Sequence, residues 1–453
     1  MQAFCFCALA ALALGGCGGR VHDPRGSAAM SGAGGDAPLD SGMPAKPCTF
    51  KGFAPAVSYT LAQAPSEITG IDNSGAGTLD LALAEQDSDE SNFRFELFVN
   101  AGNGTFTTQP AVGASDNFYG NLVSADFNGD GKIDIASQLN RYDESDGGTS
   151  GVLGVDFGTV EHAFAPTRTL YPVPFANSDL VAGDFDGDGR PDIAAIGYDF
   201  ILPSPIELGL PIPVPADFTI AVLLNTGAGT LAAPVLYPTS RSLSQLSVGD
   251  FDGDGHLDLA ALDNSSTSGF VVYFNQGGGV FRDPRPFPGA DLWSTYGLGV
   301  ADFDGDGKSD IASPAIINSN SPNEQKVLRI FNGQSDGTLS EPVNYPIQNV
   351  PSVYRVATGD FNGDGKPDVA LVMGNGTFGA PVTPIPVSVF LNQGDGSLAA
   401  PTDYFVGDAV QSSALSFMVG ELNGDGATDI AVTTTNIVEP LHKALNVLLS
   451  ECE

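Results

Sequence analysis

Six short acidic segments recur along this chain of 453 residues, and each places four oxygen-bearing side chains within nine positions. Their shared pattern is D-x-[DN]-x-D-G-x-x-D, with the oxygens at positions 1, 3, 5 and 9. A backbone that curls around such a segment points these oxygens inward, and the Gly at position 6 allows the sharp turn. Oxygen-only ligand sets containing several carboxylates suit Ca²⁺. The segments therefore predict six calcium sites.

The predicted ligands occupy the same four positions in every segment. They are Asp126, Asn128, Asp130 and Asp134; Asp184, Asp186, Asp188 and Asp192; Asp250, Asp252, Asp254 and Asp258; Asp302, Asp304, Asp306 and Asp310; Asp360, Asn362, Asp364 and Asp368; and Glu421, Asn423, Asp425 and Asp429. A backbone carbonyl near position 7 is expected to add a ligand.

Other interpretations of these segments fit less well. An EF-hand loop shares the first six positions but ends at position 12 between helices, and no helical periodicity flanks these segments. Zn²⁺ is disfavoured because the 4 His residues are scattered, and Mg²⁺ would demand an octahedron with several waters. For a single segment the alternative is an uncharged Asp-Gly turn without a metal, and six segments with the same ligand types disfavour it. A worn copy from Asp72 to Asp80 has Ser74 and Ala76 at positions 3 and 5, so we expect it to bind metal weakly or not at all.

The elements that position these loops follow from the repeat to which each loop belongs. The chain contains seven copies of the acidic segment, counting the worn one. Most copies are followed by an Asn-Gly-rich phrase and then by a Pro…Tyr phrase. One unit holds four strand-like runs, namely Leu180 to Gly183, Ile193 to Ile196, Thr219 to Leu224 and Ala232 to Tyr237. Seven units of four antiparallel strands predict an all-β, seven-bladed β-propeller, with a linear solenoid as the alternative.

The two ends of the repeat region favour a closed ring. The last unit lacks a Pro…Tyr strand, and the segment GFAPAVSYT, residues 52–60, matches TLAAPVLYP, residues 230–238, with Tyr59 aligned on Tyr237. We therefore expect the N-terminal strand to complete the last blade. In that register Cys48 and Cys452 fall at the two broken ends of one loop, which predicts a disulfide that fastens the ring.

Two further positions in each unit have structural interpretations. The residue before the first loop ligand is small in six units, as expected where innermost strands converge on an axis. The Phe at position 2 of five segments is expected to be a core anchor rather than a functional residue.

These three phrases resemble the FG-GAP/VCBS repeat family, whose relatives include the seven-bladed head of integrin α chains. The resemblance covers about residues 48–452. It implies the propeller fold and calcium binding, and it says little about any particular ligand.

The N-terminal residues predict export. Residues 1–17 read as a signal peptide whose end, LGGC, is similar to a bacterial lipobox, so that Cys17 would carry the lipid. No Lys or Arg precedes the apolar run, and an ordinary secretory signal is the alternative. Residues 18–47, rich in Gly, Ala and Pro, are expected to form a flexible tether to a propeller over residues 48–453. Gly18 favours an outer-membrane anchor over inner-membrane retention.

The net charge of −36 argues against nucleic acid as a partner and against an acidic membrane surface, leaving the N-terminal lipid as the membrane contact. No triad spacing, phosphate loop or dinucleotide motif suggests catalysis. We expect a monomeric, non-enzymatic binding or adhesion scaffold for a protein or matrix partner. A carbohydrate-binding propeller and a polysaccharide-lyase-type enzyme are the alternatives.

A partner is expected on the face opposite the calcium loops, because the irregular segments Tyr198 to Asp217 and Arg141 to Gly151 belong to that face. The aromatic candidates there are Trp293, Tyr296, Phe118, Tyr119 and Tyr354. Packing at blade junctions is the alternative role for each.

Overall fold

The computed structural model shows a chain whose regular elements, over the described residues, are all β-strands. The described residues are 30–31, 49–62, 64–72, 77–86, 93–114, 118–143, 148–159, 163–165, 167–173, 175–198, 218–264, 269–287, 297–318, 321–347, 352–374, 384–407, 412–436 and 443–452. No helix in this part of the chain is long and apolar enough to cross a membrane.

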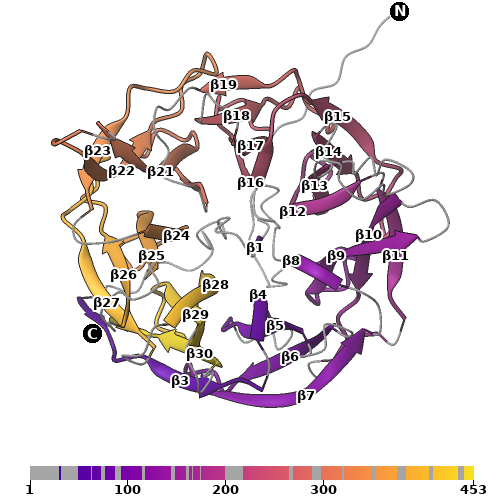
Figure 1. Ribbon diagram of the computed structural model, residues 1–453, viewed down its shortest axis with the longest axis horizontal. Coiled ribbons are helices and arrows are strands. Elements are labelled where there is room, and N and C mark those ends of the chain that lie inside the picture. The colour runs from indigo at the N-terminus through magenta and orange to yellow at the C-terminus, as the bar shows by residue number, and fades with distance from the viewer. Residues whose placement is uncertain are drawn as a thin grey trace, which may run out of the picture.

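The strands form seven radial sheets around a central axis (Figure 1), which confirms the seven-bladed propeller and rules out the linear solenoid. From the axis outward, the blades are β4 (Ala64–Ile71), β5 (Asp80–Gln86), β6 (Phe93–Asn100) and β7 (Phe106–Ala114); β8 (Phe118–Ala125), β9 (Asp134–Asp143), β10 (Gly148–Asp156) and β11 (Thr169–Val173); β12 (Ala176–Gly183), β13 (Asp192–Tyr198), β14 (Phe218–Leu223) and β15 (Val235–Thr239); β16 (Leu243–Gly249), β17 (Asp258–Asp263), β18 (Gly269–Tyr273) and β19 (Arg285–Phe287); β20 (Gly299–Ala301), β21 (Asp310–Ile317), β22 (Gln325–Phe331) and β23 (Val343–Pro346); β24 (Ser352–Gly359), β25 (Asp368–Gly374), β26 (Ile385–Phe390) and β27 (Thr402–Val406); and β28 (Ser412–Gly420), β29 (Asp429–Asn436), β30 (Lys443–Leu448) and β3 (Val57–Thr60). We number the blades 1 to 7 in this order, and each acidic loop by its blade.

The hydrophobic core lies between neighbouring blades rather than within one sheet. All six residues of β17 and all five of β18 are buried, because another blade packs on each face of these middle strands. The outermost strands lie at the rim of the ring, where one edge faces solvent. The residues of β15 are accordingly exposed or half-buried. The position-2 side chains are core anchors, as predicted. Their exposed fractions are 1% for Phe127, 0% for Phe185, 0% for Phe251, 2% for Phe303 and 0% for Phe361.

The innermost strands approach one another closely at the residue that precedes each acidic loop. A Cβ on Gly249 would lie 2.7 Å from a side-chain carbon of Val300 in the next blade, and a Cβ on Gly420 would lie 2.4 Å from Leu79. The small residues expected from the sequence are therefore required by the contact between blades.

Ring closure occurs as predicted, through the strand β3 near the N-terminus. It pairs antiparallel with β30 and forms the outer strand of blade 7, with Tyr59 opposite Leu445. The Tyr59 hydroxyl accepts the Phe106 N–H of the next blade at 3.1 Å. The Tyr237 hydroxyl accepts the Phe281 N–H at 3.2 Å in the interior of the ring. The junction between the last and first blades is thus built like an interior one.

A buried polar contact holds the same junction near the axis. Glu67 of β4 accepts a hydrogen bond from the Ser416 hydroxyl of β28, and its other oxygen lies 3.7 Å from the Arg355 guanidinium of β24. Burial raises the pKa of Glu67 to about 7, while Arg355 acts in the opposite direction. Three blades are therefore joined across the point where the ring closes.

Two segments differ from the expectation. Most of Arg141 to Gly151, expected to be irregular, continues β9 and β10, which pair as far as Asp143 opposite Gly148. Within the predicted tether, β1 (Met30–Ser31) lies at the centre of the ring in Figure 1 and pairs with β8. An innermost strand has an unpaired edge toward the axis, and that edge accepts the extra strand.

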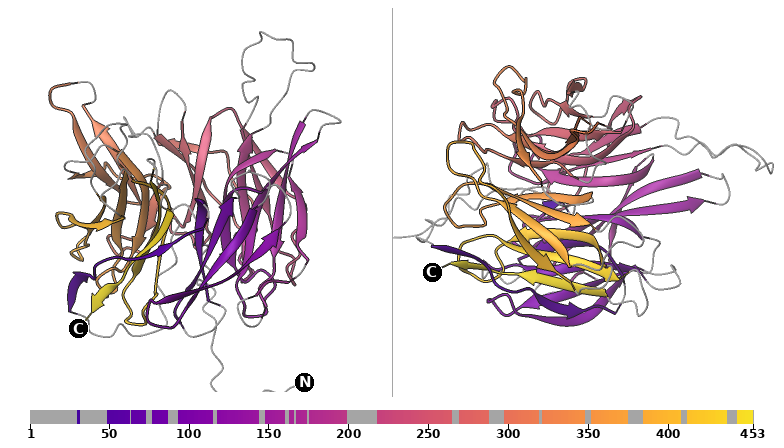
Figure 2. Two further views of the ribbon diagram at one scale, coloured as in Figure 1. Left: turned by 60° about the horizontal axis from the view of Figure 1, so that its bottom comes forward. Right: turned by 60° about the vertical axis from the view of Figure 1, so that its left-hand side comes forward.

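The two ends of the repeat region form a separate two-stranded ribbon at one face of the ring (Figure 2). In it β2 (Phe50–Phe53) pairs with β31 (Ser450–Cys452), and Phe50 stands opposite Cys452. The expected disulfide partner, Cys48, lies outside the described residues, so their pairing stays a prediction. Cys452 belongs to β31, and in the sequence Cys48 precedes the first residue of β2, Phe50, by two positions.

The disulfide prediction is tested by Cys452→Ser. We expect this change to lower the melting temperature, because a cross-link that closes almost the whole chain stabilises the folded state by up to about 5 kcal/mol in the chain-entropy model. Thermal melts of the variant and the parent, each with and without reductant, measure the effect, and only the parent should respond to the reductant. Alkylation of both Cys48 and Cys452 in the unreduced parent would contradict the pairing.

Candidate metal-binding loops

The six predicted metal loops connect the innermost strand of a blade to its second strand. In each, the first carboxylate organises the turn by accepting backbone N–H groups. Asp184 Oδ1 accepts from Gly187 at 2.8 Å and Asp188 at 3.0 Å, and Asp184 Oδ2 accepts from Gly189 at 2.8 Å. Both glycines have positive φ values, 78° and 85°, which other residues rarely adopt. The loop therefore curls around its first ligand, as the sequence predicts.

Positions 3 and 5 extend the same pattern of local hydrogen bonds. Asp186 Oδ1 accepts the Asp188 N–H at 3.1 Å, and Asp188 Oδ1 accepts the Arg190 N–H at 3.0 Å. The residue at position 7 is basic in several loops, and Arg190 forms an ion pair with Asp188. Lys308 pairs in the same way with Asp306. These exposed pairs partly neutralise the loop and are weak in water.

The aspartate at position 9 is fully buried in all six loops. Asp258 Oδ2 accepts the Phe251 N–H at 3.0 Å, and Oδ1 accepts the Asn275 N–H at 2.8 Å. The carboxylate therefore ties the acidic loop to the end of the third strand. The equivalent aspartates bond in the same way to position 2 of their own loop and to Gly158, Asn225, Gly333, Asn392 and Ser450.

Burial is the main cause of the altered acidity of these aspartates. It raises the pKa of Asp258 to about 8, and the neighbouring Asp252 and Asp250 add to the effect, against the lowering by the backbone hydrogen bonds. The same cause raises the pKa to about 7 for Asp134, Asp192 and Asp310, and to about 8 for Asp368 and Asp429. A cation held by these oxygens would offset the cost of burying a negative charge.

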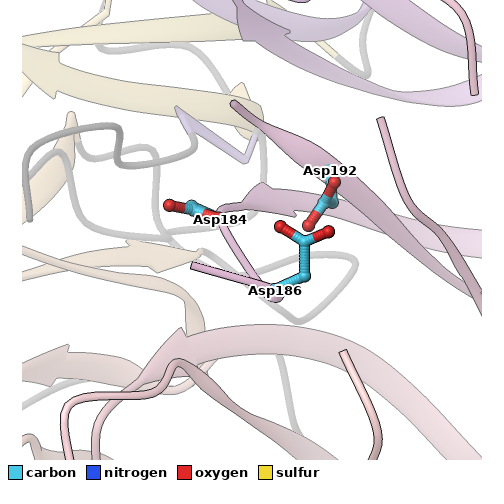
Figure 3. Close-up of side chains that lie close together, drawn as sticks. All are labelled: Asp184, Asp186 and Asp192. Carbon is cyan, nitrogen blue, oxygen red and sulfur yellow. The ribbon is translucent and has the colours of Figure 1, made fainter. Parts of the chain in front are cut away.

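The side-chain oxygens converge most clearly in three blades. Each residue in the groups Asp184, Asp186, Asp192; Asp250, Asp252, Asp254; and Asp302, Asp304, Asp306 offers an oxygen within 4.8 Å of the others. Figure 3 shows the carboxylates of Asp186 and Asp192 facing each other, with Asp184 beside them. The donor set is oxygen only, so the residues present fit Ca²⁺. The ligand assignments themselves stay predictions.

The worn loop of blade 1 distinguishes the structural role of position 9 from the predicted metal-binding role of the whole loop. Ser74 and Ala76 lie outside the described residues, so the expectation of weak binding stays a prediction. Asp80, at position 9, is buried and accepts the Asn100 N–H at 2.7 Å, like its counterparts in the other blades. Position 9 therefore has a structural role that does not depend on a complete ligand set.

A second set of residues, missed in the sequence interpretation, joins the loops of adjacent blades. The Asn225 side-chain amide donates to the carbonyl of Phe127 in the preceding loop at 2.8 Å and to that of Pro191 in its own loop at 3.0 Å. Asn275, Asn392 and Asn100 make the same pair of bonds. We call these four residues the bridging asparagines. Their recurrence in the Asn-Gly-rich phrase was the available signal.

The remaining predicted site residues are only partly described. Cys17, Trp293 and Tyr296 lie outside the described residues. Phe118 and Tyr119 belong to β8 and Tyr354 to β24, so they lie in innermost strands rather than in the expected loops. The proposed aromatic surface is therefore untested.

Known proteins resemble this chain in sequence and in fold. A family model described as FG-GAP-like repeat matches residues 72–137, 250–313 and 316–371. The T-cell immunomodulatory protein of Rattus norvegicus is 27% identical over 273 residues, which cover 56% of this chain and 41% of that protein. The match thus spans less than half of the relative's length.

Solved structures that match this chain share a low level of similarity with it. The NanB sialidase of Streptococcus pneumoniae, as the K499G mutant, matches at a TM-score of 0.39 and 12% identity, covering 88% of this chain and 68% of the sialidase. The Dos1 propeller matches at 0.37 and 9% identity, covering 88% of this chain and 95% of that one. These scores support no inference about activity.

The two roles within a loop predict different mutational effects. Asp258→Ala should destabilise the protein by about 3 kcal/mol even in chelator, because two buried N–H groups lose their acceptor. Asp254→Ala, an exposed position-5 change in the same loop, should cost less than about 1 kcal/mol in chelator and show its main loss only with Ca²⁺ present. Urea unfolding with and without calcium measures both. Equal losses in chelator would contradict the division of roles.

The raised pKa values of the position-9 aspartates also predict how the free energy of unfolding depends on pH. The carboxyl of Asp258 titrates near 3.8 when unfolded and near 8 in the fold without metal. As pH rises through this window, the unfolded chain releases protons that the folded state retains, so the free energy of unfolding should fall. Calcium binds the ionised form, so its addition should flatten or reverse the trend. Melts from pH 5 to pH 8 in chelator test this, and stability that rises with pH would contradict it.

Proposed function

From the FG-GAP-like repeats that this chain carries, we propose that it is a calcium-stabilised, non-enzymatic propeller that serves as a binding scaffold outside the cell. The observation that supports the proposal most directly is the loop geometry. Six loops present oxygens at the same four positions, and all six place a buried aspartate at position 9. A repeated site of one kind around a ring is typical of a structural ion rather than of a single catalytic centre.

The electrostatics of the chain support the same role. A net charge of −36 opposes folding through self-repulsion, and the loops concentrate much of that charge on one face. Six calcium ions would contribute twelve positive charges where the repulsion is greatest. Calcium sites of extracellular modules work at dissociation constants of about 10⁻⁴ to 10⁻³ M, a range met outside cells. We therefore place the protein on the cell envelope, exported by residues 1–17 and held through a lipid on Cys17.

The partner would use the face opposite the acidic loops. Hydrogen bonds between blades hold the acidic loops to the turns that carry the bridging asparagines. Binding residues often lie on loops carried by a rigid scaffold, so we expect the partner at the loops of the other face. We propose a protein or matrix component as the ligand, bound without chemical conversion.

The calcium proposal predicts a countable result. Titration of Ca²⁺ into chelator-stripped protein should show about six ions per chain by calorimetry, with a marked rise in melting temperature. Asp304→Ala should reduce the count by one and leave the other sites. Binding of no ions, with the same melting temperature in calcium and in chelator, would overturn the proposal. A matched NaCl series controls for screening of the net charge.

A further inference from the structure

Each bridging asparagine contacts two consecutive acidic loops, not one. The Asn225 N–H donates to Asp192 Oδ1 of its own loop at 2.6 Å, while its side-chain amide donates to the Phe127 carbonyl of the preceding loop at 2.8 Å. The Phe127 N–H in turn donates to Asp134 Oδ2 at 2.9 Å. A continuous path of three hydrogen bonds therefore links the position-9 carboxylate of loop 2 to that of loop 3.

The same path recurs between other blades. Asn275 joins loops 3 and 4, bonding Asp258 at 2.8 Å and the Phe185 carbonyl at 2.7 Å. Asn392 joins loops 5 and 6, bonding Asp368 at 2.7 Å and the Phe303 carbonyl at 2.8 Å. Asn100 joins loops 7 and 1 across the ring closure, through Asp80 at 2.7 Å and the Leu422 carbonyl at 2.7 Å.

Two of the blades without a bridging asparagine use a different bond between loops. Blade 5 has Gly333 and blade 7 has Ser450 at the bridging position. In these blades the N–H at position 8 donates to the position-1 carbonyl of the preceding loop, Ser309 to Asp250 at 2.8 Å and Thr428 to Asp360 at 2.7 Å. Where position 8 is Pro191 or Pro367, which has no N–H, the blade has the asparagine instead. Blade 1 has both bonds, because the Leu79 N–H donates to the Glu421 carbonyl at 2.9 Å beside Asn100.

We infer that calcium binding is coupled between adjacent blades through the bridging asparagines, an inference that rests on the proposed calcium binding. A cation would fix the carboxylates of its own loop and, through the position-9 carboxylate, the position-2 residue. The carbonyl of that residue accepts from the side-chain amide of the asparagine of the next blade, whose backbone N–H donates to the next position-9 carboxylate. The second loop is then partly ordered before its own ion arrives, so its ion binds more tightly.

The test follows each loop separately during a Ca²⁺ titration of the whole protein. The N–H of the position-6 glycine donates to the position-1 carboxylate, as in Gly131 with Asp126 and Gly189 with Asp184, both at 2.8 Å. Amide resonances of these glycines therefore report the occupancy of single loops. Asp186→Ala removes a ligand from loop 3. The midpoints of its bonded neighbours, loops 2 and 4, should rise about fivefold or more. The midpoint of loop 6, across the ring, should not change.

Removal of one bridge isolates its contribution. In Asn225→Ala the midpoint of loop 2 should no longer respond to Asp186→Ala, whereas loop 4, bonded through Asn275, should respond as before. Thr226→Ala changes an exposed residue of the same turn and should preserve both responses. If Asn225→Ala does not fold, the comparison of loops 2, 4 and 6 in the Asp186→Ala protein still decides the question.

The outcomes distinguish the two proposals. If the glycine signals do not respond to millimolar Ca²⁺, the calcium proposal itself fails. If they respond but Asp186→Ala leaves the midpoints of loops 2 and 4 unchanged, or shifts loop 6 equally, the coupling inference is wrong and calcium binding stands.

Discussion

A buried carboxylate at position 9 of each loop is the interaction on which the rest of the ring depends. It is desolvated by the blades on either side, and it tolerates that burial by accepting N–H groups from its own loop and from the end of the third strand. Asp258 shows both bonds, at 3.0 and 2.8 Å. Removal of such an acceptor would leave buried donors unpaired, so the position is constrained even where metal ligands are lost. The turn, the strand pairing and the contact between blades all converge on this one side chain.

Closure of the ring imposes the second constraint, because the outward faces of the first and last blades are buried only if the last blade packs on the first. The protein meets it by repeating its interior contacts at the junction. Tyr59 repeats the contact of Tyr237, and Asn100 repeats that of Asn225. Glu67, Ser416 and Arg355 add a contact near the axis. A linear array would gain nothing from these bonds, which have meaning only in a closed ring.

The repeat, the number of blades and the closing strand could be predicted from the sequence because their signals are local and recur at short spacing. Tyr59 could be aligned with Tyr237 from nine neighbouring residues. The bridging role of Asn225 could not, because its partner Phe127 is 98 residues away, and that of Asn100 still less, with Leu422 at a separation of 322. The extension of β9 and β10 beyond the blade was also missed, since pairing of two polar strands has no apolar periodicity to reveal it.

The worn loop of blade 1 shows how the two functions of the motif can be separated. It keeps oxygens at positions 1 and 9, Asp72 and Asp80, and lacks the acidic residues at positions 3 and 5. In complete loops those two positions are half-buried or exposed, and some carry an ion pair with a neighbouring base, as Asp364 does with Lys366 at 3.6 Å. Such exposed pairs contribute little to stability, so a divalent cation would displace them at small cost. Under the proposed calcium binding, reversible binding would reside in the outer carboxylates, whereas the buried carboxylate at position 9 serves the architecture. A blade that gives up the outer carboxylates can therefore still keep its place in the ring, as blade 1 does through Asp80.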